Sequence, residues 1–138
     1  MENGHDYLSA DEILAMDDIP TEAVLVPEWK HRTVLVCGLT AAAKNAYQSS
    51  LVEIQGKTRK LKLEHATAKL LVRTLVNQKR EALFTESQIL KLSTKSAAVL
   101  ERLAKVASRL SGMDEEENEA LLKNSDAAQS DDSPTVSL

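Results

Sequence analysis

Apolar residues recur along the chain with two different spacings, which divide it into an extended N-terminal part and a helical remainder. Residues 21–27 and 33–38 are two short runs rich in β-branched side chains, separated by a polar break, a pattern typical of a β-hairpin. Pro27 is expected to end the first strand and Gly38 the second. Because two strands alone are marginally stable in water, we expect a helix to cover one face of this hairpin. No other segment predicts a strand.

A short helix is predicted before the hairpin. Ser9 and Glu12 have the spacing of a capping box, and an apolar stretch follows before residues 17–20 end the helix. A helix of about two turns is not stable on its own. We therefore expect it to dock on another surface through Ile13 and Leu14, with Ile19 as a further contact.

From Thr40 onward the apolar spacing is helical. The pattern predicts a helix from Thr40 to Gly56, a second over 63–77, a short one opened by a capping box at Thr85, a longer one capped by Ser93 and reaching about Leu110, and a last one from Asp114 to Leu122. The basic stretch 57–62 and the polar connection 77–82 separate these helices.

The sequence thus predicts an α+β, mostly helical fold. A short N-terminal helix and a β-hairpin are followed by four or five short amphipathic helices, in a single domain over residues 1–124. Residues 125–138 are polar, acidic and without periodicity, which predicts a disordered tail.

Composition narrows the classes of function. The 138 residues include only four aromatic side chains, Tyr7, Trp29, Tyr47 and Phe84, so the core must be aliphatic and an aromatic surface for stacking bases is excluded. Cys37 is the single cysteine, which excludes an intramolecular disulfide and suits a reducing compartment. The sequence has no apolar run of the ~20 residues that a membrane helix needs. It also has no signal-peptide pattern at its start. We expect a soluble, intracellular protein.

The net charge of −4 conceals a strong segregation. Residues 1–28 carry eight acids and no Lys or Arg, residues 29–110 carry sixteen basic residues and five acids, and residues 111–138 carry eight acids and one Lys, giving −8, +11 and −7. Nucleic-acid binding is disfavoured, because the isoelectric point is about 5.4 and most basic residues lie at the spacing of solvated helix faces. The counter-charges we expect are acidic proteins or the chain's own acidic ends.

Residues that could perform catalysis or hold a metal do not form a recognisable set. The three histidines share no helical spacing, so we interpret them as solvated, and Cys37 has no base nearby in sequence and is interpreted as a small buried hydrophobe. We predict no catalytic residue, no cofactor and no metal site, and hence no enzyme. Trp29 lies in the predicted hairpin turn, where it is either a lid over the core or an exposed interface anchor.

The order of these landmarks resembles a known family, the tail assembly chaperones of long-tailed, siphovirus-type phages and prophages. The similarity extends over roughly residues 8–124 and is carried by residues 9–19, 24–29, 34–40, 83–84, 92–103 and 110–112. Two turns depart from the family pattern. Lys30 and His31 stand where members often have glycine, and residues 77–82 contain no glycine.

The resemblance implies a non-catalytic assembly factor that acts in the host cytoplasm and is absent from the finished particle. Its partners would be the tape-measure protein and the tail-tube protein, and this chain would be the short form made without a ribosomal frameshift. Self-association stays open. The apolar faces of the hairpin and helices are expected to contact the client through Val24, Val26, Trp29, Val34, Val36, Leu71, Leu75, Leu100 and Leu103. The alternatives are a structural tail or head–tail component retained in the virion and a nucleic-acid-binding regulator.

Overall fold

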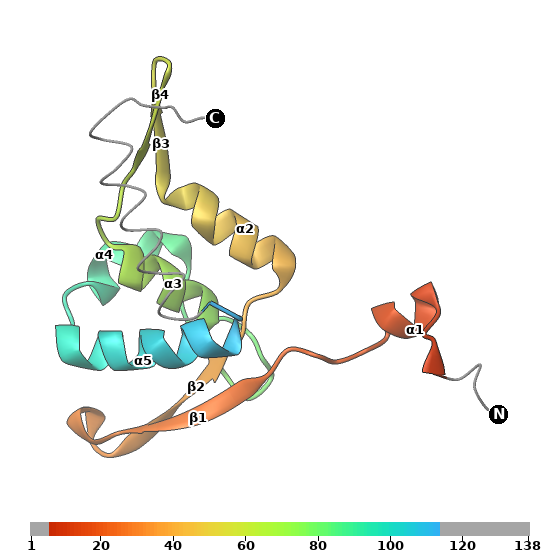
Figure 1. Ribbon diagram of the computed structural model, residues 1–138. Coiled ribbons are helices and arrows are strands. Elements are labelled where there is room, and N and C mark those ends of the chain that lie inside the picture. Colours follow the sequence, from red (N-terminus) through yellow and green to blue (C-terminus); the bar gives the residue numbers. More distant parts are fainter. Residues whose placement is uncertain (1–5, 114–138) are drawn as a thin grey trace.

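The computed structural model describes residues 6–113 and has the α+β, mostly helical class that the sequence predicts (Figure 1). Its helices are α1 (Ala10–Leu14), α2 (Ala41–Ser50), α3 (Ala66–Thr74), α4 (Ile89–Leu92) and α5 (Ala97–Leu110), with 3-10 turns η2 (Pro27–Trp29) and η3 (Glu86–Gln88). Its strands are β1 (Thr21–Val26), β2 (Arg32–Cys37), β3 (Val52–Gln55), β4 (Thr58–Leu61) and β5 (Leu75–Val76).

The predicted hairpin is confirmed and forms most of a three-stranded antiparallel sheet. β1 pairs with β2 from Thr21 opposite Cys37 to Val26 opposite Arg32, and η2 makes the connection. β5 adds to the other edge of β2, so the strand order is β1-β2-β5. Because β5 directly continues α3, this helix is fixed to the sheet through the backbone.

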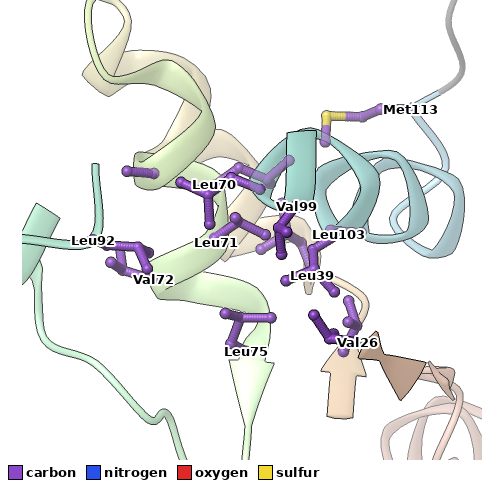
Figure 2. Close-up of a cluster of buried hydrophobic side chains, with 14 residues drawn as sticks. Val26, Leu39, Leu70, Leu71, Val72, Leu75, Leu92, Val99, Leu103 and Met113 are labelled. Atoms are coloured by element: carbon purple, nitrogen blue, oxygen red, sulfur yellow. The ribbon is translucent and has the colours of Figure 1, made fainter. Parts of the chain in front are cut away.

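The core lies where α3 and α5 pack against each other and against the sheet (Figure 2). Val26 and Val36 from the hairpin, Leu71 from α3 and Leu103 from α5 are completely buried. The fully buried members of this cluster are all aliphatic or Met, as the shortage of aromatic residues predicts. Trp29, Tyr47 and Phe84 pack around it and remain partly exposed.

Gly38 brings the end of β2 into backbone contact with the end of α5. A Cβ atom at this position would lie 2.6 Å from the carbonyl oxygen of Leu110, closer than atoms pack. The Gly38 N–H donates to the Pro20 carbonyl oxygen at 2.9 Å, and the Leu39 N–H donates to Ser111 Oγ at 2.9 Å. These contacts join the start of β1, the end of β2 and the end of α5.

Two helices predicted from apolar spacing are shorter in the structure. The helix predicted to reach Gly56 ends at Ser50, and residues 52–61 instead form the two-stranded hairpin β3–β4, so the prediction of only two strands was wrong. The physical reason is that buried Leu51 caps α2 and its carbonyl accepts the N–H of Lys62, so that the chain after Leu51 pairs with residues 58–61 instead of continuing the helix. The helix predicted over 63–77 ends at Thr74, where the chain pairs with β2 as β5.

The longest helix begins later than predicted. The Ser93 N–H still donates to the carbonyl of Ile89, as part of the end of α4. The cap of α5 is Ser96, whose Oγ accepts the N–H of Val99 at 3.3 Å. The capping box at Thr85 is confirmed, and it opens η3 and α4. The predicted last helix and tail lie outside the described residues.

Helix α1 has the predicted start and projects from the core of the described chain. Ser9 and Glu12 form the capping box, which confirms that prediction. Ile13 and Leu14, however, are 54% and 82% exposed, and α1 projects from the rest of the described chain (Figure 1). These two side chains are therefore not packed in the core of the described chain, and their docking on another surface stays a prediction.

The close approach of Leu110 to Gly38 predicts that one added methyl group at this position strongly lowers the stability of the fold. Gly38→Ala forces the backbone of Leu110 away from β2, and overpacking of this kind costs about 1–3 kcal/mol in the free energy of unfolding. Urea unfolding followed by circular dichroism measures it. Thr33→Ala, at an exposed position of the same strand, is the control and is expected to change stability by less than ~0.5 kcal/mol. Equal effects of the two substitutions would contradict the steric role of Gly38.

Candidate functional site

An apolar hollow with a basic edge lies between the hairpin turn and α4. It has a volume of about 420 Å³ and is lined by Trp29, Phe84, Gln88, Lys91, Leu92 and Lys95; we call it the Trp29 groove. Two of the protein's four aromatic residues meet here. The volume lies within the range of sites that bind ligands of modest size, and the lining suits apolar side chains with acidic neighbours.

The turn η2 places Trp29 in this groove. Pro27 occupies its first position, where a missing N–H costs nothing. The turn closes with Lys30 and His31, which both have left-handed backbone angles, φ 60° and 54°. Such angles are unfavourable for residues other than glycine, so tertiary contacts must hold the turn in place.

Glu28 provides one of these contacts, through a two-pronged ion pair with Arg102 on α5. Arg102 Nη1 donates to Glu28 Oε1 at 3.1 Å, and Nη2 donates to Oε2 at 2.6 Å. Hydrogen bonding by Arg102 is the main reason that the pKa of Glu28 is lowered from 4.5 to about 2. The pair fixes η2 on α5 and thereby fixes the neighbouring Trp29 beside Phe84.

Two further ion pairs join the acidic N-terminal segment to the basic part of the chain. Asp17 Oδ1 accepts from Arg80 Nη1 at 2.8 Å, and Glu22 Oε1 accepts from Arg109 Nη2 at 2.7 Å. With Glu28, these pairs confirm that three of the N-terminal acids serve as internal counter-charges. The acidic residues after 113 lie outside the described part of the chain.

Six of the nine residues predicted to contact a client are in the core. Buried positions are Val26, Val36, Leu71, Leu75, Leu100 and Leu103, and those that reach the surface in part are Val24, Trp29 and Val34. In this conformation, only the latter three are available to another molecule without rearrangement. Contact of any of the nine with a client stays a prediction.

The residues beside Trp29 were not singled out from sequence. Phe84, Lys91 and Leu92 are more than fifty positions away along the chain, and only the packing of α4 against α3 brings them to the hairpin turn. One signal was present: Phe84 is the only phenylalanine. A lone aromatic residue next to a capping box indicates that the start of the helix packs against the protein. It does not indicate which residue it packs against.

The described residues show no arrangement for metal binding. No group of three or more metal-ligating side chains occurs within residues 6–113. Cys37 is half-buried, and desolvation raises the pKa of its thiol. His65, interpreted above as solvated, is instead half-buried, with Nδ1 3.1 Å from Ser93 Oγ. No helix of residues 6–113 has the length and apolar character needed to cross a membrane.

Comparisons with known proteins identify one family from the sequence and one similar fold from the structure. The model of a family described as phage tail assembly chaperone matches residues 13–121. The solved structure of the bacteriophage HK97 tail assembly chaperone is similar, with a TM-score of 0.55 and 20% sequence identity over 72% of this chain and 90% of that chain. At this identity the likeness shows a shared fold. A search of curated proteins found no match.

The Glu28–Arg102 pair predicts a pH dependence with a definite sign. A carboxyl whose pKa is lower in the folded protein stabilises it above its usual pKa, and this contribution is lost as the pH falls from 4.5 towards 2. In Arg102→Gln, the pKa of Glu28 is expected to rise towards 4.5, as measured by carboxyl NMR shifts during acid titration. Arg109→Gln, which removes a pair on the same helix, should leave Glu28 unchanged. A Glu28 pKa near 2 in Arg102→Gln would contradict the assignment.

Proposed function

Because the chain belongs to the phage tail assembly chaperone family, we propose that it binds the tape-measure protein and brings tail-tube subunits to it during tail assembly. The match over residues 13–121 carries this proposal, since it includes the hairpin, the Trp29 groove and α5. The proposed site of action is the host cytoplasm, and the chaperone is proposed to leave before the particle is complete.

The Trp29 groove is the surface that we propose for the client. Its floor of Trp29, Phe84 and Leu92 accepts apolar side chains from one face of an amphipathic helix. Lys91 and Lys95 at its edge attract acidic residues that flank those side chains. A tryptophan in a partly closed hollow is a frequent anchor of protein interfaces.

The size of this groove suits a reversible contact. A hollow lined by six residues covers a small part of a long client, so each copy binds weakly and many copies are needed to cover the apolar length of a tape-measure protein. A weak contact also allows tail-tube subunits to replace the chaperone. The proposed mechanism is therefore shielding by many replaceable copies, without a chemical step.

Two other functions make different predictions. A structural tail or head–tail component would remain in purified virions, whereas a chaperone would be absent from them. A nucleic-acid-binding regulator would bind DNA or RNA with a steep dependence on salt. The ion pairs that use Arg80, Arg102 and Arg109 internally argue against the regulator, because these guanidinium groups are already occupied.

The proposal predicts that Trp29 is needed for binding the client. Co-expression of the full chain with the tape-measure protein is expected to increase the soluble tape-measure fraction and to give a complex in gel filtration. Trp29→Ala should weaken this complex by about 2 kcal/mol, roughly 30-fold in Kd, as for an interface anchor. Quenching or a blue shift of the fluorescence of Trp29, the only tryptophan, reports binding directly.

Ile54→Ala provides the matched control, since Ile54 is 70% exposed on the distant β3–β4 hairpin. It should retain full binding. Failure of the wild-type chain to form any complex would refute the chaperone function. A complex that forms equally well with Trp29→Ala, in a variant shown to be folded by circular dichroism, would refute the groove as the client site.

A further inference from the structure

The β3–β4 hairpin and the residue after it, 52–62, form a positively charged projection that we call the basic arm. It extends beyond the end of α2 (Figure 1), and residues 54–60 are all exposed. The arm has one acid, Glu53, and four basic residues, Lys57, Arg59, Lys60 and Lys62. Within residues 6–113, none of these four forms an ion pair, whereas four arginines elsewhere do. The arm therefore carries positive charge that the described residues leave uncompensated.

The acids near the N-terminus are placed away from the basic arm. Asp17, Glu22 and Glu28 already pair with arginines beside the β1–β2 hairpin. Helix α1 carries two more acids and projects from a different side of the described chain than the arm (Figure 1). The other acidic part of the chain is residues 114–138, with eight acids and one Lys, and five of these acids lie within 114–119. Their charge is complementary to that of the arm.

The described chain ends beside the start of α2, the helix that leads to the basic arm. The Leu39 N–H donates to Ser111 Oγ at 2.9 Å, two residues before the buried Met113. From this point the ten residues of α2 run about 15 Å towards the arm. Six extended residues span about 20 Å, so residues 114–119 are long enough to reach the base of the arm. Along this path α2 carries Lys44 and no acid, so no like charge opposes the segment.

We propose that the acidic segment 114–119 docks along α2 onto the basic arm of its own chain. Its carboxylates approach the ammonium and guanidinium groups of Lys57, Arg59 and Lys62. The short connection from Met113 keeps the segment close to the arm, which gives it a high effective concentration there. The acidic segment of the same chain thereby competes well with acidic molecules in solution.

The contact is electrostatic and reversible. Ion pairs between exposed side chains each contribute little and are screened by salt, so several charges must act together. Docking of the segment shields an arm that would otherwise attract nucleic acid through its clustered positive charge. The contact needs neither a client nor the Trp29 groove, so its failure would leave the proposed chaperone function untouched.

The test measures the distance between the segment and the arm in the full chain. A nitroxide spin label is attached through Ala120→Cys, in a Cys37→Ala background that leaves no other thiol. At low salt, the amide NMR signals of residues 57–60 should lose about half of their intensity relative to the reduced label, because the tethered segment keeps the label near the arm. The loss should disappear at ~1 M NaCl, where the screening length is about 3 Å. Amide signals of η2, far from the arm (Figure 1), should keep their intensity.

Two charge variants of the labelled chain show whether the arm is the binding surface. Lys57→Glu/Arg59→Glu reverses two charges of the arm and leaves its acid–base pair across the strands unchanged; it should abolish the intensity loss. Lys30→Glu/Lys79→Glu is the matched control, because it makes the same change in net charge at two exposed lysines outside the arm; the loss should remain. Amide spectra that otherwise match that of the parent chain show that both variants fold.

Several results would overturn the proposal. They are the absence of an intensity loss at low salt, a loss that persists in Lys57→Glu/Arg59→Glu, and an equal loss at the amides of η2. A single-stranded DNA oligonucleotide tests the other occupant. It should shift the amide signals of the arm more strongly once Glu115, Glu116 and Glu117 are replaced by Gln. Equal shifts with and without these charges would show that the segment does not shield the arm.

Discussion

The burial of α3 and α5 against the β1–β2 hairpin is the interaction on which the rest of the structure depends. Leu71, Val36 and Leu103 meet there without access to water, and each such side chain contributes about 1.5–3 kcal/mol. A two-stranded hairpin is not stable alone, and η2 needs residues with left-handed backbone angles. The turn that carries Trp29 therefore exists in this form because the helices hold the strands beneath it, and the groove beside it is a consequence of core packing.

The parts of the fold that the sequence predicts are those in which one local pattern decides the outcome. The hairpin has two β-branched runs around a polar break, and the capping box of α1 consists of two residues three positions apart. The β3–β4 hairpin was missed because Leu51 and Ile54 continue a helical spacing that began at Ala43. Only pairing with residues 58–61, which have one large apolar side chain among basic ones, turns this segment into a strand. Pairing of that kind is a tertiary effect.

The candidate site was predictable only in its central residue. Trp29 stands out because it is the only tryptophan and lies in a predicted turn. For the other residues, regular apolar spacing looks the same whether a face packs in the core or binds a partner. Val26, Leu75 and Leu103 follow that spacing and are buried, whereas Leu14 follows it and is exposed. The difference arises from reach. Helix α1 is held by Asp17 at one end of β1 and projects away from the core of the described residues (Figure 1).

Arginines and lysines have different roles among the basic residues. This difference explains how the chain combines a turn of fixed geometry with a groove that can bind different acidic segments. Arg80, Arg102 and Arg109 each pair with an N-terminal acid at less than 3 Å. Arg102 uses both arms of its guanidinium fork on Glu28, a geometry that fits one carboxylate. Lys91 and Lys95 line the groove instead. An ammonium group on a flexible stem has no preferred partner geometry and follows a carboxylate wherever it approaches. The two-pronged pair thus lies where the turn is held, and the flexible lysines lie where acidic segments of a client would approach the groove.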